Sequence, residues 1–317
     1  MAKSFASVLI DTYNHERFIE QAIVSVLEQD FPATDREIIV VDDGSTDRTP
    51  EIVKKFEPRV RLLRKENGGQ ASAFNAGIPE CKGEIVAFLD GDDWWAPGKL
   101  QAVADALASE TSIGLLGHGI TEVFPDGSRR VQLLKDVPRL RIDSETGARA
   151  FRLRKSFLGT SRMIIRAAVL REIGRVPEAL TIQADEYMFT LAGFLSDVLI
   201  LGESLTFYRL HAGNAFQVTD GNKQVLRRKQ KVLESLAKSL ITHVDGSARP
   251  QTVEKEINPL YWRLIDEFGK RTGVPVIMNT SFNLRGEAIV HTPTDAIRTF
   301  FSSGMDALVI GSFLVEK

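Results

Sequence analysis

The sequence predicts an α/β fold, in which helices flank a mostly parallel sheet, for the larger part of its 317 residues. Short apolar runs alternate with stretches of helical periodicity, an order that favours right-handed crossovers between parallel strands. Acidic turns directly follow two of these runs, at 42–47 and 90–93. Open α/β sheets bind their ligands at the carboxyl ends of the strands, so these turns are the first candidates for a functional site.

The composition is that of a soluble globular protein, with 43% hydrophobic and 26% charged residues. A net charge of −2 and the absence of a basic stripe interleaved with aromatic residues argue against a nucleic-acid partner. No run approaches the roughly 18 apolar residues of a membrane span, and the first residues lack the apolar core of a signal peptide. One cysteine, Cys81, excludes an internal disulfide and the usual cysteine zinc sites. A cytoplasmic protein is therefore expected.

Four strands and three helices are predicted before residue 95. The strands are the apolar runs at 8–10, 38–41, 60–63 and 85–89. The first helix has apolar residues at helical spacing: Phe18, Ile19, Ala22, Ile23, Val26 and Leu27. The second begins near Pro50, with Ser45 or Thr46 as its cap, and Gly68-Gly69-Gln70 opens the third.

Three carboxylates, Asp90, Asp92 and Asp93, follow the strand at 85–89. Hard oxygen ligands suit Mg²⁺ or Mn²⁺, and these metals usually reach a protein together with substrate phosphates. The alternative interpretation is an acidic turn that caps the next helix, for which Pro97 is a suitable first residue.

The turn at 42–47 should emerge at the same edge of the sheet. Asp42 and Asp43 could accept hydrogen bonds from a base and a ribose, while Asp90 and Asp92 handle the ribose and the metal on a diphosphate. Ordinary helix capping at 42–47 and a plain loop at 68–69 are the alternatives. The glycine-rich dinucleotide fingerprint and the P-loop are both absent, which excludes a Rossmann dehydrogenase and a P-loop kinase.

Four motifs in this order resemble the donor half of family 2 glycosyltransferases: Asp42 to Asp47, Asn67-Gly68-Gly69, Phe74 to Gly77, and Leu89 to Trp95. The resemblance implies the GT-A nucleotide-diphospho-sugar transferase fold, an inverting reaction, a UDP-sugar donor, and Mn²⁺ or Mg²⁺ bound by Asp92. The implied donor-binding residues are Thr12, Tyr13, Asn14, Asp42, Asp43, Asn67, Gly69, Gln70, Asn75, Asp90 and Gly91. One departure is Asp11, where a proline more often precedes Thr-Tyr-Asn, and it is not expected to affect the metal.

Three later segments resemble the acceptor half of that family: Gly159-Thr160-Ser161, Ala184 to Tyr187, and Tyr208 to Asn214. A sugar hydroxyl needs a base to take its proton, and Asp185 is the predicted base because a carboxylate among apolar neighbours can have a raised pKa. Glu186 is the alternative base, with Asp185 as a helix cap. His211 is expected to complete the metal shell or, alternatively, to be a structural histidine. Trp94, Trp95, Gly159 and Thr160 are assigned to the acceptor or phosphate region.

The tail has a different character from the rest of the chain. After a linker at 246–252, residues 253–317 resemble the extreme C-terminus of nodulation-type O-carbamoyltransferases, through Thr272 to Val276, Asn279 to Asn283, Gly286-Glu287 and Leu308 to Gly311. In that family the stretch belongs to the domain that handles ATP and carbamoyl phosphate, which makes Asn279, Asn283 and Arg285 the implied polar contacts. A fragment of this size has a thin core. It is interpreted as a packing or dimerising module, a docking piece for a separate carbamoyltransferase, or a partial nucleotide site.

The sequence therefore predicts a glycosyltransferase domain at 1–245 and a carbamoyltransferase-like fragment at 253–317. The acceptor is a glycan, a lipid-linked molecule or a small molecule. The alternatives are ATP or carbamoyl phosphate binding by the tail, and a non-catalytic scaffold. Residues 223–238 carry Arg227, Arg228, Lys229 and Lys231 on a predicted helix. This is a solvated face or, as the minor alternative, a contact with an anionic membrane or acceptor.

Overall fold

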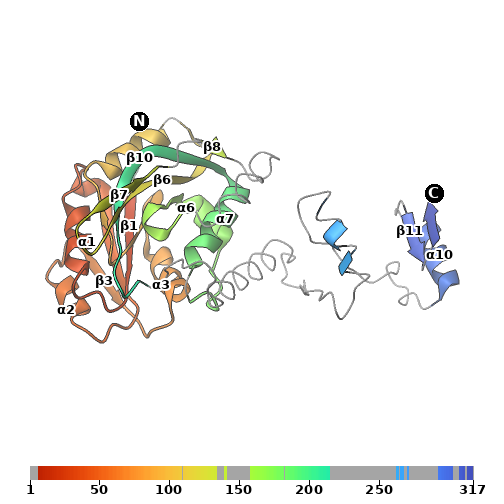
Figure 1. Ribbon diagram of the computed structural model, residues 1–317, viewed down its shortest axis with the longest axis horizontal. Coiled ribbons are helices and arrows are strands. Elements are labelled where there is room, and N and C mark those ends of the chain that lie inside the picture. Colours follow the sequence, from red (N-terminus) through yellow and green to blue (C-terminus); the bar gives the residue numbers. More distant parts are fainter. Residues whose placement is uncertain are drawn as a thin grey trace. The chain divides into compact units, whose positions relative to one another are not determined.

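The computed structural model describes residues 6–108, 110–133, 139–140, 158–181, 183–214, 262–263, 265–267, 270, 292–302, 307–310 and 313–316. The chain divides into two compact units, Met1–Pro250 and Gln251–Lys317, which are described separately (Figure 1). No helix in the described part of the chain is long and apolar enough to cross a membrane.

The N-terminal unit is built on one mixed sheet, with the strand order β3-β2-β1-β4-β9-β6-β10-β5 (Figure 1). The four strands of its first half are parallel: β1 (Ala6–Thr12), β2 (Arg36–Asp42), β3 (Arg61–Arg64) and β4 (Ile85–Asp90). This confirms the predicted parallel α/β arrangement.

The second half of the sheet mixes directions. Strand β9 (Ile164–Arg166) is antiparallel to both β4 and β6 (Ile113–Val123) and joins the two halves. Strand β10 (Asp197–Arg209) is parallel to β6 and antiparallel to the two-residue strand β5 (Trp94–Trp95). The short strands β7 (Arg129–Gln132) and β8 (Arg139–Leu140) pair with β6 and β10. Because of β5, the residues that follow β4 contact the C-terminal end of β10.

Helices cover both faces of the sheet. One face packs on α1 (Ile19–Leu27), α2 (Thr49–Lys54) and α4 (Lys99–Ala108). The other packs on α3 (Gln70–Gly77), α6 (Ala167–Ile173) and α7 (Ala184–Leu195). Along β1, Val8 and Ile10 join the first apolar cluster and Leu9 joins the second. A strand buried on both faces reads as a continuous apolar run, which is why these strands stand out in the sequence.

The cap predicted for the second helix is wrong. Helix α2 begins at Thr49, and the side chain that accepts its first free amide is that of Asp47, whose Oδ1 lies 2.9 Å from Thr49 N. The Ser45 hydroxyl instead accepts a hydrogen bond from Asn14 N at 2.8 Å, and Asn14 Oδ1 accepts from Thr46 N. A contact across 31 positions of the chain therefore uses the hydroxyl that local capping would have needed.

The C-terminal unit contains the helix α10 (Pro293–Phe301) and the antiparallel hairpin of β11 (Ala307–Ile310) and β12 (Phe313–Glu316). Phe300 is fully buried, while Ile297 and Phe301 are exposed. The predicted linker at 246–252, the basic stretch at 223–238 and the polar residues Asn279, Asn283 and Arg285 lie outside the described residues.

Candidate functional site

The carboxyl ends of β2, β1 and β4 meet at one edge of the sheet. The register places Thr12 opposite Asp42 and Asp11 opposite Asp90. Two further backbone bonds extend this alignment, from Asp43 N to Thr12 O at 2.9 Å and from Gly91 N to Asp11 O at 2.8 Å. The two acidic turns therefore leave the sheet on either side of the central strand, as the sequence predicted.

The carboxylates of the first turn are engaged by the protein itself. Asp43 accepts hydrogen bonds from the backbone amides of Gly68 and Gly69, the latter at 2.7 Å, and from Lys65 Nζ at 2.6 Å. Asp42 has no exposed surface, accepts from Ser45 N, and forms an ion pair with Arg64 Nε at 3.2 Å. Both side chains fix the shape of the loops around them.

These loops border an open depression of about 620 Å³, lined by Gly44, Arg64, Lys65, Glu66 and Asn67. Its size lies in the usual range for a small-molecule ligand. Gly44 has φ +80°, and a Cβ there would lie 2.7 Å from Asn67 N, so the close approach of the two loops requires glycine. The two cationic side chains in the wall, Arg64 and Lys65, are paired with Asp42 and Asp43.

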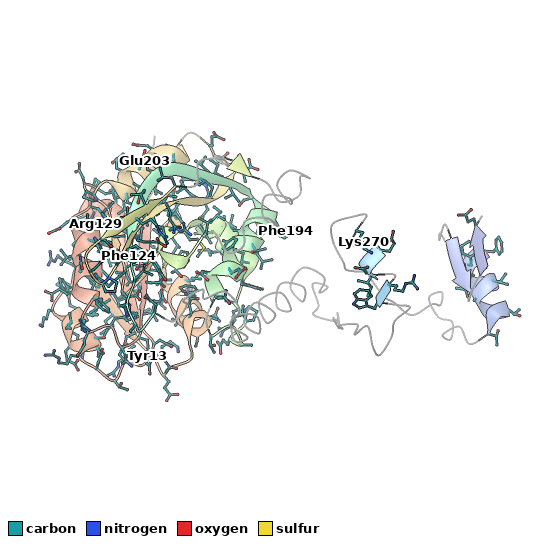
Figure 2. The ribbon with its side chains drawn as sticks, viewed as in Figure 1. Tyr13, Phe124, Arg129, Phe194, Glu203 and Lys270 are labelled. Atoms are coloured by element: carbon teal, nitrogen blue, oxygen red, sulfur yellow. The ribbon has the colours of Figure 1, made fainter. Side chains whose placement is uncertain are left out.

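The loop after β1 also contributes to this edge. Tyr13 is 44% exposed (Figure 2), whereas Thr12 is buried and its hydroxyl lies 3.2 Å from His15 Nδ1. A Cβ at Gly91 would lie 2.6 Å from the Thr12 hydroxyl, so Gly91 lets the second acidic turn approach this loop. Thr12, Tyr13, Asn14 and Gly91 are thus brought together as predicted.

Asp92 faces two histidines. Its Oδ2 lies 2.9 Å from His211 Nε2 and 3.9 Å from His15 Nε2. Burial alone would raise the pKa of Asp92, but the hydrogen bond from His211 and the charges of the two histidines lower it. His15 was not predicted. Its position directly after Thr12-Tyr13-Asn14 is the sequence signal that points to it.

The donor atoms of Asp92 and His211 suit Mn²⁺ or Mg²⁺, with carboxylate oxygen as the preferred type. Within the described residues no group of three or more histidine, cysteine, aspartate or glutamate side chains is arranged to hold a metal ion. The protein therefore offers two donors, and substrate phosphate oxygens and water would supply the rest, the usual arrangement for magnesium-type sites. The residues present fit such a metal on these terms.

Asp90 and Asp93 are held by a buried polar network that the sequence did not reveal. Ser161 Oγ donates to Asp93 Oδ2 at 2.7 Å and accepts from Asp90 N at 3.0 Å. Lys99 Nζ, with no exposed surface, donates to Ser161 O at 2.8 Å. Burial raises the pKa of Asp90 and of Asp93, and neighbouring carboxylates add to both shifts. Because Asp93 bonds to Ser161 rather than to a helix amide, the capping interpretation of this turn is wrong.

Arg209 ties the last strand to the acidic turn. Its amide donates to Asp93 Oδ1 and its Nε donates to Asp92 O, both at 2.9 Å. The guanidinium lies between two rings, 4.7 Å from the centre of Phe18 and 4.5 Å from that of Trp94. Trp95 is 2% exposed and covers Lys99 Nζ at 4.1 Å, so it supports the site from inside the core.

Asp185 opens α7 on the other side of the site. Its Oδ2 accepts from Thr160 N at 3.0 Å and from Thr160 Oγ1 at 3.2 Å. Gln70 links the two segments, since its amide donates to Thr160 Oγ1 and accepts from Ala184 N, both at 2.9 Å. Burial raises the pKa of Asp185 to about 6. A carboxylate with that pKa is suited to take a proton near neutral pH.

The remaining predicted residues have different surroundings. Glu186 is partly exposed, and its Oε2 accepts from Gln183 Nε2 at 3.0 Å. Gly159 faces the base, because a Cβ there would meet Asp185 Oδ2 at 3.9 Å. Asn75 makes two 2.8 Å bonds to the backbone of Val176 and thereby joins α3 to the loop after α6. Asn75 thus lies in a structural contact.

Two family models match the chain. Residues 7–174 match the model of glycosyl transferase family 2, which is more than half of the chain, and residues 207–317 match the model of the carbamoyltransferase C-terminus. The chain therefore belongs to glycosyl transferase family 2 and carries a carbamoyltransferase C-terminal region. The second match begins at residue 207, in β10, earlier than the sequence resemblance placed it.

Two curated relatives reflect these two parts. The uncharacterized glycosyltransferase alr2836 of a Nostoc species is 32% identical over 214 residues, which cover 66% of this chain and 65% of that protein. The nodulation protein NolO of Bradyrhizobium diazoefficiens is 46% identical over 110 residues, 33% of this chain and 20% of NolO. The chain thus spans less than two thirds of either relative.

Solved structures share the fold. The structure of residues 1–349 of the Staphylococcus aureus protein TarS, in complex with UDP-GlcNAc, aligns over 98% of this chain and 96% of that fragment with a TM-score of 0.59 and 20% identity. The mannosyltransferase PcManGT of Pyrobaculum calidifontis, with GDP-Man and Mn²⁺, covers 87% of this chain and 85% of its own with a TM-score of 0.51 and 17% identity. These matches agree with the GT-A fold that the sequence predicted.

Proposed function

We propose that the chain is an inverting glycosyltransferase that moves a sugar from a nucleotide-diphosphate sugar to an acceptor hydroxyl. The observation that carries this proposal is the pairing of two different carboxylates at one sheet edge. Asp185 is buried with a raised pKa of about 6, while the pKa of Asp92 is lowered by its histidines. Surroundings that raise the pKa of one carboxylate and lower the pKa of another suit the first to proton transfer and the second to binding positive charge.

A UDP-sugar is the proposed donor. TarS, which shares the fold, was solved with UDP-GlcNAc. In this chain the base would enter the depression beside Gly44 and Asn67, the ribose would lie over the ends of β1 and β4, and the diphosphate would reach Asp92. The acceptor is a glycan, a lipid-linked molecule or a small molecule, bound beside Trp94, Gly159 and Thr160.

The protein's own side chains have two tasks in the proposed reaction, proton transfer and metal binding. Asp185 takes the proton of the acceptor hydroxyl while that oxygen bonds to the anomeric carbon and the bond to the diphosphate breaks. Thr160, held by Gln70, aims the carboxylate of Asp185. Asp92 and His211 would hold Mn²⁺ or Mg²⁺, which neutralises negative charge on the leaving diphosphate. Glu186 is the alternative base, but its bond to Gln183 Nε2 and the raised pKa of Asp185 favour Asp185.

Calorimetric titration tests the site and names the nucleotide. UDP, GDP, dTDP and ATP are titrated with and without Mn²⁺ into the wild type and into Asp92→Ala. We expect UDP to bind in a manganese-dependent manner, and the variant to lose that binding. Asp126→Ala is the matched control, since this exposed carboxylate accepts a hydrogen bond from Ser128 N within its own turn. Binding of ATP alone, unchanged in Asp92→Ala, would contradict the proposal.

The carbamoyltransferase region supports a second role. Its match to residues 207–317 is specific, but NolO extends far beyond the part that this chain covers. We propose that the region is a packing or dimerising module, with docking to a separate carbamoyltransferase as the alternative. A homodimer in size-exclusion chromatography with light scattering would favour the first, and a monomer would favour the second.

A further inference from the structure

One carboxylate at the sheet edge has no role in the mechanism above. Asp11 is the penultimate residue of the central strand β1, where it pairs with Val41 of β2 and Asp90 of β4. Its Oδ1 is sealed from solvent and has no hydrogen-bond partner among the residues that the structure describes. A buried carboxylate oxygen without a partner is costly, and its retention needs an explanation such as a bound ligand.

The neighbouring carboxylates are already engaged. Asp43 accepts from two backbone amides and from Lys65, and Asp42 pairs with Arg64. Asp90 shares Ser161 with Asp93. At the end of the central strand the oxygen without a hydrogen-bond partner is Oδ1 of Asp11, although the sequence had suggested Asp42, Asp43 and Asp90 for the contacts to the nucleoside.

The position of Asp11 defines what it can touch. Side chains alternate along a strand, so Asp11 lies on the same face as Leu9, beneath the helices α3 and α7. Burial, with a smaller contribution from the charges of Asp92, Asp185 and Asp43, raises the pKa of Asp11 to about 8. Asp11 is thus surrounded by the loop proposed for the nucleoside, the carboxylate proposed for the diphosphate, and the proposed base.

We propose that the carboxylate of Asp11 binds the ribose of the donor nucleotide by accepting a hydrogen bond from its 2′- or 3′-hydroxyl. This rests on the proposed function, because it takes the nucleotide diphosphate as given and assigns its sugar contact. A ribose lies between base and diphosphate, which is the place of Asp11 between Asp43 and Asp92. A site built around a substrate hydroxyl discriminates strongly against an analogue that lacks it.

The test removes the proposed hydrogen bond in two ways, by deleting a ribose hydroxyl of the ligand and by substituting Asp11. UDP, 2′-deoxy-UDP and 3′-deoxy-UDP are titrated with Mn²⁺ into the wild type, Asp11→Ala, Asp11→Asn and the control Asp126→Ala. We expect the wild type to bind UDP at least about 10-fold more tightly than one of the two deoxy analogues, because the analogue would leave a buried polar group without its partner. Asp11→Ala should bind UDP about 10-fold more weakly and lose that preference, while Asp126→Ala keeps it.

A thermal melt of the free proteins separates ligand binding from a structural role. Removal of an unpartnered buried carboxylate should leave the Tm of Asp11→Ala equal to or above that of the wild type. A lower Tm in both variants would assign Asp11 to the fold and overturn the inference.

The titrations have two further outcomes that contradict it. If the wild type binds UDP and Asp11→Ala retains the full preference for the ribose, the proposed function stands and the role of Asp11 falls. If no nucleoside diphosphate binds the wild type, the proposed function fails, and the inference fails with it.

Discussion

At the scale of single residues, the site depends on how each carboxylate is surrounded. Burial raises the pKa of Asp185 to about 6, although the two hydrogen bonds from Thr160 lower it, so this carboxylate can accept a proton near neutral pH. Asp92 faces His211 and His15, which favour its charged form. The two aspartates are therefore suited to different tasks, because their neighbours shift their pKa values in opposite directions.

The first prediction concerns Asp185. Because general-base catalysis is worth about 10²–10⁴-fold, Asp185→Asn should lower kcat by about that factor. The affinity for UDP with Mn²⁺ should stay unchanged, since Asp185 does not contact the nucleotide in the proposed arrangement. Steady-state kinetics and titration calorimetry measure the two quantities. Glu186→Gln is the matched control, and the reverse outcome, an inactive Glu186→Gln beside an active Asp185→Asn, would make Glu186 the base.

The second prediction concerns pH. The folded pKa of Asp185 is about 6 and the ordinary value is 3.8, so the folded protein holds this proton over a range in which the unfolded chain has lost it. A base works only when deprotonated, so kcat should fall about tenfold for each pH unit below about 6. By the same linkage, the stability that this group contributes is present below pH 3.8 and lost as the pH rises through about 6. A rate that stays constant down to pH 4.5 would exclude Asp185.

Some site residues could be predicted from the sequence because they belong to short motifs. Others could not, because they act through contacts that are distant in the chain. Asp92 and Asp185 belong to short motifs, so they stand out without any knowledge of the fold. Ser161 and Lys99 act through contacts across 62 to 71 positions of the chain. Lys99 shares a helical spacing with the buried Val103 and Leu107, which is the one sequence feature that marks its side chain as buried.

At the scale of elements, the strands of the parallel half were predictable because they are buried on both faces. Strand β5 was harder, since Trp94–Trp95 becomes a strand only through its pairing with β10, which is distant in the chain. Helix α3 packs against β1 and β2 through a residue with no side chain. A Cβ at Gly77 would overlap Leu9 Cδ1 and lie 2.7 Å from Val41 Cγ2.

The third prediction follows from that contact. Gly77→Ala should lower the free energy of unfolding by about 1–3 kcal/mol, the usual cost of overpacking a core. Urea unfolding followed by circular dichroism measures the change. Gly202→Ala is the control, because no atom lies within 4 Å of a Cβ placed there. Equal stability of the two variants would mean that α3 can move away from the sheet without cost.

At the scale of the whole molecule, the chain joins two compact units with different relatives. The fold class of the first was predictable because its motifs and strand pattern agree. The boundary between them stays a prediction, because the sequence places it at 246–252 whereas the carbamoyltransferase match already begins at residue 207. The proposed donor site lies entirely within the first unit, so it should work independently of the polar residues of the tail.

The last prediction tests that independence in the intact chain. UDP with Mn²⁺ at about 100 times its Kd should stabilise the folded state by about 2.7 kcal/mol and raise the Tm of the N-terminal unit by several degrees. Arg285→Ala should show the same rise, because Arg285 belongs to the carbamoyltransferase region, whereas Asp92→Ala should show none. Differential scanning calorimetry distinguishes these results. A rise that Arg285→Ala abolishes would mean that the tail takes part in nucleotide binding, and the donor site would then have to include both units.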